Sequence, residues 1–376
     1  MREFPLDLDK LESVLNHLNL GVYITDMERR IVLWNRKATE ITGFRAEDVV
    51  GSACHDNVLV HTDKDGHNLC RTDHCPLYRS IQRGRESEEP ILVYARTASG
   101  GRVPVSTSTA PLRNSDGEVV GGIETFRDES DNLRDLELAQ RIQRNLLPES
   151  LPQSGGYAFD CRYYPHDLIG GDFYDILRLG QNRWGVLLAD VSGHGVSAAL
   201  YTMQLKSIAR AKASLAASTG RFVAALNTEL AGFVVAEAFA TACYAVMNTE
   251  TGEFTYANAG HPQPLLYRAA ESRAVPLSGA GVPLGILAGQ DYDCHTYNLA
   301  PGDLVLFYTD GAAEVANETG EMLGTDGVAK LLVEELREQR STSENLLERL
   351  YQEIEARCAA ISLPDDLTLL SVARTP

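Results

Sequence analysis

Basic residues are scarce in this chain of 376 residues: 34 Lys and Arg stand against 52 Asp and Glu, a net charge of -18. Nucleic-acid binding needs a basic surface that neutralises phosphates, so this balance argues against a nucleic-acid partner and disfavours a metal-dependent nuclease. No apolar run reaches the roughly 18 residues of a membrane span, and residues 1–5 lack a basic-then-apolar signal-peptide layout. We therefore expect a cytoplasmic protein with no membrane partner.

Paired C-x-x-C strings are also missing, and the seven cysteines are odd in number. This usage favours reduced thiols over a disulfide framework. Nucleotide-binding strings of the G-x-x-x-x-G-K-[ST] and G-x-G-x-x-G types are absent as well. The apolar content of 44% is ordinary for globular proteins. The length predicts two or three domains.

The N-terminal third reads as one small α+β domain. Apolar residues at helical spacing predict a helix over 8–20, and a second helix is expected over 36–41. Turn-forming residues separate the segments that we interpret as strands. These segments are 22–25, 31–34, 91–97, 103–110 and 119–126.

This region resembles a PAS sensor domain and is assigned to residues 9–128. The resemblance depends on five segments, namely Gly21 to Asp26, Ile31 to Asn35, Ala38 to Phe44, Gly51 and Gly117 to Phe126. It implies that the domain receives a signal, with an unknown ligand or metal as one means of sensing it.

Residues 129–150 form a charged segment that predicts a helical linker. Its apolar residues recur at the spacing of a short two-stranded coiled coil. Two interpretations stay open: the helix joins two chains into a homodimer, or it packs on its own chain. The apolar residues are Leu133, Leu136, Ala139 (or Leu138 in its place), Ile142 and Leu146.

Strand-like and helix-like runs then alternate irregularly over residues 151–376. Strands cluster and helices follow, a pattern typical of a β-sandwich with helices on its outer faces. The whole chain is therefore expected to be α+β. Strands are expected at 158–164, 172–179, 184–191, 240–248, 253–258, 263–267, 303–309 and 367–373, and helices at 196–213, 220–235, 326–338 and 342–358.

Four aspartates stand at the ends of apolar runs in this region: Asp172, Asp190, Asp310 and Asp365. A lone Asp-Gly is usually a turn, but carboxylates from several strand ends converge on one point in a sandwich. All-oxygen sites suit hard cations such as Mg²⁺ or Mn²⁺. The pattern therefore predicts a metal site that activates water.

The surrounding strings are Gly170 to Asp175, Ala189 to Gly195, Tyr308 to Gly311 and Asp365 to Leu370. Together they resemble the metal-dependent PPM serine/threonine phosphatases, most closely the bacterial branch of stress and sporulation regulators, over residues 135–373.

The resemblance implies a catalytic set of Asp172, Asp190 and Asp310, and two Mn²⁺ or Mg²⁺ ions. Asp190 would bridge the ions, assisted by the carbonyl of Val191. Asp310 would hold one ion together with Asp365, which is favoured as the ligand over the alternative Asp366, and Asp172 would lie on or near the other ion. Outside the ligands themselves, the expected supporting residues are Asp366, Asp175 and His194.

The implied function is dephosphorylation of a phosphoserine or phosphothreonine protein, by resemblance a phosphorylated anti-anti-sigma factor of a partner-switching pathway. The alternative is a signalling scaffold whose phosphatase-like domain is inactive. A serine hydrolase using Ser192 and His194 is disfavoured, because no Gly stands two residues before the Ser.

A second cluster lies in the sensor region, where three of the seven cysteines and four of the nine histidines fall between residues 54 and 75. Thiolate and imidazole suit soft metals, and clustered thiols also respond to oxidation. Buried packing is the ordinary alternative. The residues proposed for a metal or redox role are Cys54, His61, Cys70 and Cys75.

Overall fold

The computed structural model describes residues 13–70, 72–154, 156–193, 195–232, 238–338, 345–359 and 363–375. The chain divides into two compact units between Asp135 and Leu136, and each unit is described by itself. None of the helices in the described ranges is both long and apolar enough to cross a membrane. The predicted domain limits at 128 and 150 stay predictions.

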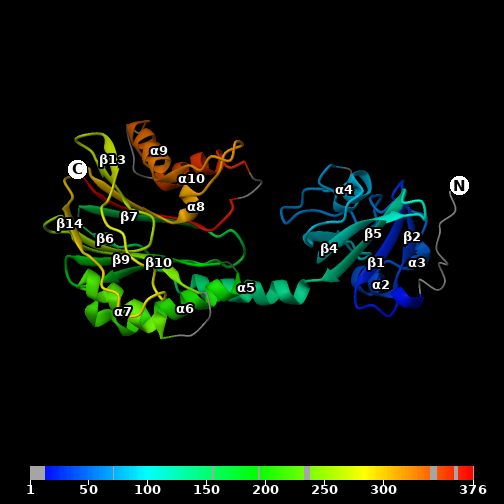
Figure 1. The fold of residues 1–376 in the computed structure, drawn as a ribbon, viewed down its shortest axis with the longest axis horizontal. Helices are drawn as coiled ribbons and strands as arrows, with labels where there is room; N and C mark the ends of the chain where they lie inside the picture. The colour runs from blue at the N-terminus through cyan, green and yellow to red at the C-terminus, as the bar shows by residue number, and fades with distance from the viewer. Residues whose placement is uncertain are drawn as a thin grey trace. The chain divides into compact units, whose positions relative to one another are not determined.

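The N-terminal unit is built on one antiparallel five-stranded sheet of order β2-β1-β5-β4-β3 (Figure 1). Asn35 joins its opening strands to the first helix, because its Oδ1 accepts from Ala38 N and Val22 N while its amide donates to Leu15 O. The elements are β1 Gly21–Asp26, β2 Ile31–Trp34, α2 Arg36–Thr42, α3 Ala46–Val49, α4 Pro76–Arg83, β3 Ile91–Arg96, β4 Arg102–Arg113 and β5 Val119–Asp128.

Two antiparallel sheets form the C-terminal unit. The first has the order β14-β11-β10-β9-β8, and the second has the order β13-β12-β15-β16-β7-β6. Their strands are β6 Gln153–Ser154, β7 Tyr157–Tyr164, β8 Asp172–Arg178, β9 Arg183–Val191, β10 Ala240–Asn248, β11 Glu253–Ala259, β12 Leu265–Arg268, β13 Arg273–Pro276, β14 His295–Asn298, β15 Leu304–Tyr308 and β16 Leu367–Arg374.

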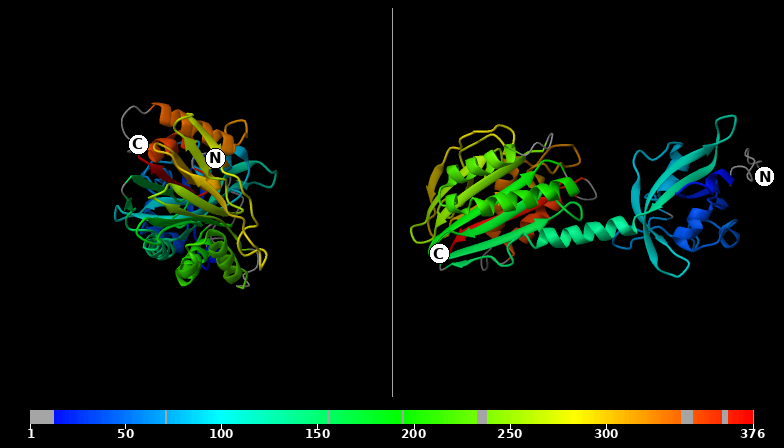
Figure 2. Two further views of the ribbon diagram at one scale, coloured as in Figure 1. Left: turned by 90° about the vertical axis from the view of Figure 1, so that its left-hand side faces the viewer. Right: turned by 90° about the horizontal axis from the view of Figure 1, so that it is seen from below.

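Helices cover both outer faces of this sandwich (Figures 1 and 2). Helices α6 and α7 pack on the first sheet, and α8, α9 and α10 pack on the second. Alternate strand residues therefore face either the helices or the space between the sheets. The helices are α6 Val196–Ala211, α7 Thr219–Ala231, α8 Asp310–Ala313, α9 Gly324–Glu338 and α10 Leu346–Glu355.

The mixed α+β class and the helix-flanked sandwich are confirmed. The linker helix is α5, Ser130–Arg144. The expected helix over 8–20 is wrong in its described part, which is helical only at 13–15 before turns begin. Parts of the expected helices 220–235 and 342–358 lie outside the described residues. Six short elements were not expected: α3, α4, α8, β6, β13 and β14.

Candidate metal centre

The first sheet supplies two aspartates that face each other. Asp172 opens β8 and is the cross-strand partner of Asp190 near the end of β9. Phe173 and Val191 belong to the core beneath α6 and α7. Because side chains alternate along a strand, Asp172 and Asp190 point the other way, into the space between the sheets.

The second sheet supplies the other two from the same end. Asp310 follows β15, Asp365 precedes β16, and these strands pair antiparallel up to Tyr308 and Leu369. A side chain at Gly311 would collide with the backbone carbonyl of Asp366. Glycine at 311 therefore permits the close approach of these two loops.

One oxygen of Asp172 is held and the other is free. Its Oδ2 accepts hydrogen bonds from Thr309 Oγ1 at 2.8 Å and from Thr368 Oγ1 at 2.6 Å, both from the opposite sheet. Its Oδ1 is buried and has no hydrogen-bond partner. A buried carboxylate oxygen without a donor is costly, and a cation would satisfy it. The residues present therefore fit a metal ion.

The electrostatics agree with this fit. Burial, followed by the charges of Asp190 and Asp366, raises the pKa of Asp172 well above its usual range. Burial and then Asp310 and Asp365 raise the pKa of Asp190 to about 8. Burial and Asp365 likewise raise the pKa of Asp310 to about 6. These carboxylates repel one another, and divalent cations would remove the repulsion.

The carboxylate oxygens of the four aspartates are spread too widely to coordinate a single ion without bound water. Within the described ranges, no three of these aspartates bring their oxygens within 4.8 Å of one another. Mg²⁺ usually keeps several bound waters and takes few protein carboxylates. The spread therefore suits two hydrated ions better than one ion stripped of water.

Asp366 has a different task from its neighbour. Its Oδ1 accepts from His166 N at 2.7 Å and its Oδ2 accepts from Gly171 N at 2.6 Å. Asp366 thus holds the loop that leads into Asp172. Both oxygens are used, which supports the expectation that Asp365 is the ligand and Asp366 lies behind it.

The other residues predicted for the site do not all lie at the metal centre. Asp175 faces α6, where it forms a buried ion pair with Lys206 at 2.6 Å, so it has a structural partner away from the metal centre. The carbonyl of Val191 lies against Gly171, where a Cβ would stand 2.7 Å from its oxygen. His194 lies outside the described residues.

Three further residues of this centre were not predicted. Thr309 and Thr368 orient Asp172, as described above. The third is Glu314, whose charge contributes to the raised pKa of both Asp190 and Asp310. Glu314 stands four residues after Asp310, and this spacing places two side chains on the same face of a helical turn. This spacing in the sequence could have identified Glu314 as a residue of the centre.

Comparison with known families decides the assignment. The family model of Stage II sporulation protein E (SpoIIE) matches residues 180–375, just over half of the 376 residues. The chain belongs to the SpoIIE family. A PAS fold model matches residues 15–132, so the N-terminal unit is a PAS domain.

Named relatives of this SpoIIE-family chain include two from Bacillus subtilis. The chain is 27% identical to phosphoserine phosphatase RsbU over 64% of its own length and 70% of the relative. It is 28% identical to phosphoserine phosphatase RsbP over 48% of its length, spanning 45% of that relative. It is also 26% identical to protein IcfG of Synechocystis, spanning 42% of it. The chain thus spans less than half of two of these relatives.

Solved structures show the same fold. The RsbU and RsbW domains of Rv1364c from Mycobacterium tuberculosis match with 31% identity and a TM-score of 0.50, over 58% of this chain and 60% of that one. The SiaA-PP2C domain of Pseudomonas aeruginosa matches with a TM-score of 0.56 and 22% identity, over 65% of this chain and 97% of that one. The C-terminal unit therefore has the PP2C fold.

The cysteine and histidine cluster of the PAS domain is partly assembled. Glu124 is fully buried, accepts from the Tyr23 hydroxyl at 2.8 Å and lies 3.5 Å from His61 Nε2. Cys70 lies at the same place, because its sulfur accepts from His61 N at 3.2 Å. A shared role of the four predicted residues in sensing stays a prediction.

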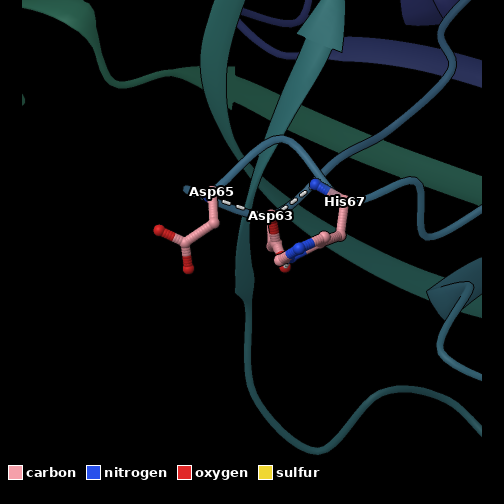
Figure 3. Close-up of side chains that lie close together, drawn as sticks. All are labelled: Asp63, Asp65 and His67. Carbon is pink, nitrogen blue, oxygen red and sulfur yellow. Dashed lines mark hydrogen bonds and ion pairs between the residues drawn. The ribbon is translucent and has the colours of Figure 1, made fainter.

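A different trio in this domain has the spacing of metal ligands. The ligand atoms of Asp63, Asp65 and His67 lie within 4.8 Å of one another (Figure 3). However, Asp63 accepts from the backbone N–H groups of Asp65 and His67 and contacts His67 Nδ1 at 2.9 Å. These bonds stabilise a surface turn and account for the cluster without a ligand.

Removing one of the two donors to Asp172 should weaken metal binding. Thr368→Val keeps the shape of the side chain and deletes one hydrogen bond to Oδ2. We expect Mn²⁺ affinity, measured by calorimetric titration, to fall about 10-fold, as for other residues that orient a ligand. The matched control is Thr255→Val, which removes an exposed threonine pair with Thr296 in the same unit. Equal affinities for the two variants would contradict the orienting role of Thr368.

Proposed function

We propose that this chain removes phosphate from phosphoserine or phosphothreonine in a small regulatory protein, under control of its PAS domain. The enzyme class is protein serine/threonine phosphatase, given the family and the relatives named phosphoserine phosphatase. The observation that carries the proposal is the orphaned Oδ1 of Asp172 among convergent carboxylates from two sheets.

The residues of the metal centre have different proposed roles, which follow from their positions. Asp190 is the cross-strand partner of Asp172, and the charges of Asp310 and Asp365 raise its pKa, so it is the candidate bridge of a two-ion site. Bound Mn²⁺ or Mg²⁺ would supply water activation at neutral pH and charge neutralisation at the phosphoryl group. Thr309 and Thr368 fix the orientation of Asp172. Asp366 holds the loop before Asp172.

For the substrate, we propose a phosphorylated anti-anti-sigma protein of a partner-switching pathway in the cytoplasm. The support is the kinship with RsbU and RsbP. Net charge of -18 disfavours nucleic acid as a competing substrate. The inactive-scaffold alternative predicts no turnover of any phosphoester.

A metal-dependence assay tests the enzyme separately from its substrate. The full chain should release phosphate from a phosphoserine peptide with Mn²⁺ or Mg²⁺, and excess EDTA should abolish the release. Restoration by added Mn²⁺ is the control for damage by the chelator. Turnover that persists in EDTA, or no turnover with either metal, would contradict the proposal.

Homodimer formation through α5 is a further part of the proposal. Leu138 and Ile142 are 56% and 47% exposed and stand four residues apart, so they share one helix face. The double change Leu138→Glu and Ile142→Glu should convert dimer to monomer in light scattering. Arg141→Gln, on the same exposed helix, should leave the mass unchanged. A monomeric parent protein would rule the dimer out.

A further inference from the structure

One polar side chain of α5 is buried although most of its helix is exposed. Gln143 is only 5% exposed, whereas the adjacent Ile142 is 47% exposed. Burying an amide is costly unless its donors and its acceptor find hydrogen-bond partners. Gln143 belongs to the C-terminal unit, which begins at Leu136, and the partners of its amide lie in that unit.

The main partner of Gln143 is the backbone of a single residue, Gly170. The Nε2 of Gln143 donates to Gly170 O at 2.6 Å, and its Oε1 accepts from Gly170 N at 3.3 Å. Nε2 also donates to Thr202 Oγ1 of α6 at 3.2 Å, and the Thr202 hydroxyl donates in turn to Ala199 O. Position 143 therefore needs a donor and an acceptor together. An ionised glutamate could accept but not donate, and a lysine could donate but not accept.

Gly170 leads directly into Asp172, whose Oδ1 is the orphaned oxygen of the metal centre. The residue between them, Gly171, is held from the second sheet, because its N–H donates to Asp366 Oδ2 at 2.6 Å. A side chain at Gly170 would collide with the same Asp366 carboxylate. Since this segment has no side chains of its own to hold it, its position depends on groups that bind its backbone, and Gln143 binds both backbone groups of Gly170.

We infer, on the basis of the proposed function, that Gln143 is a positioning residue of the two-ion site, which fixes the Gly170 backbone and thereby the place of Asp172. The Asp172 carboxylate is oriented by two threonine hydroxyls of the opposite sheet. The backbone that leads to it is held by Gln143 on one side and by Asp366 on the other. Gln143 is not itself a ligand and acts through Gly170. The helix α5 thus carries a residue that serves the metal centre.

Loss of the Gln143 amide should loosen this segment and weaken metal binding. Gln143→Met keeps an unbranched side chain of similar length and removes the amide. We expect the Mn²⁺ affinity of the full chain, measured by calorimetric titration, to fall at least ~10-fold, as for other residues that orient a ligand. The matched control is Gln140→Met, the same change at a half-buried glutamine earlier on α5, and it should leave the affinity unchanged. Parent-like affinity in Gln143→Met would overturn the proposal.

Hydrogen exchange measured at single amides separates positioning from a general loss of stability. In EDTA, the Gly170 amide of the parent protein should exchange slowly, and Gln143→Met should accelerate its exchange while amides of the sheet core keep their rates. A rapidly exchanging Gly170 amide in the parent would overturn the proposal before any variant is made. Thr202→Val should lower the Mn²⁺ affinity less than Gln143→Met does, because both bonds to Gly170 remain. An equal loss in the two variants would overturn the role assigned to Gly170.

Mn²⁺ binding and hydrogen exchange need no turnover, so they test Gln143 separately from the phosphatase assignment. With a phosphoserine peptide, turnover by Gln143→Met should fall at limiting Mn²⁺ and recover in excess Mn²⁺, because mass action refills a weakened site. A loss of turnover that excess Mn²⁺ does not restore would contradict a role through metal binding. A parent protein that turns over the peptide, together with a variant that binds Mn²⁺ normally, would overturn the role of Gln143 and leave the phosphatase assignment standing.

Discussion

Asp190→Asn is expected to abolish phosphatase activity and, in the metal-free protein, to raise the melting temperature. We expect the activity to fall because Asp190 is the proposed bridge between two cations and an amide would be a poor ligand there, a loss of several kcal/mol or roughly 10³-fold. The stability rises because folding buries Asp190 next to Asp310 and Asp365 and raises the pKa of its carboxyl from 3.8 to about 8.

The raised pKa of Asp190 determines how the stability of the metal-free protein changes with pH. A raised pKa means that the folded state favours the protonated carboxyl, so stability is lost as pH rises from about 4 towards about 8. Near neutral pH asparagine avoids this loss. Removal of about 1 kcal/mol of repulsion should raise the melting temperature by ~2–4 °C.

Differential scanning calorimetry in EDTA measures the effect. The difference between Asp190→Asn and the parent should vanish near pH 4, where both side chains are neutral. Mn²⁺ should raise the melting temperature of the parent and should have little effect on the variant. A less stable Asp190→Asn in EDTA, or unchanged activity, would contradict the placement of Asp190 in a repulsive metal centre.

The neighbouring pair Asp365 and Asp366 should respond in opposite ways to the same change. Asp365→Asn should lose Mn²⁺ affinity and activity while the metal-free protein keeps its stability. Asp366→Asn should lower stability, because one amide cannot accept from both His166 N and Gly171 N. A buried N–H left unpaired costs about 1–3 kcal/mol. Both variants lose one charge, so the electrostatic change is matched between them.

The comparison is made in EDTA by thermal unfolding and with Mn²⁺ by calorimetric titration. Asp366→Asn should melt several degrees below Asp365→Asn. If Asp365→Asn is the less stable variant and binds Mn²⁺ normally, the two roles are reversed. Restoration of stability in Asp366→Glu is not expected, since the longer side chain would crowd Gly170, which already lies against the Asp366 carboxylate.

The pattern of apolar runs was enough to predict most strands of both units, because alternation and turn residues are local properties. The pattern missed β13 and β14. Each of these strands has only four residues, and half of those residues are exposed. It misjudged residues 13–20, where helical spacing was present but Val14 is 64% exposed and the helix ends at residue 15. Tertiary packing, and not periodicity, decides such short segments.

For the metal centre, the sequence by itself determined which residue types are available and that each aspartate ends a strand. Only the tertiary structure decided how they are used. Asp172 and Asp175 are three residues apart on β8. Because side chains alternate along the strand, Asp172 lies between the sheets, whereas Asp175 pairs with Lys206 of α6. Thr309 and Thr368 meet Asp172 only because two sheets pack face to face, 137 and 196 positions away along the chain. Hydrogen-bond partners of that kind depend on packing across the sandwich, which no local pattern records.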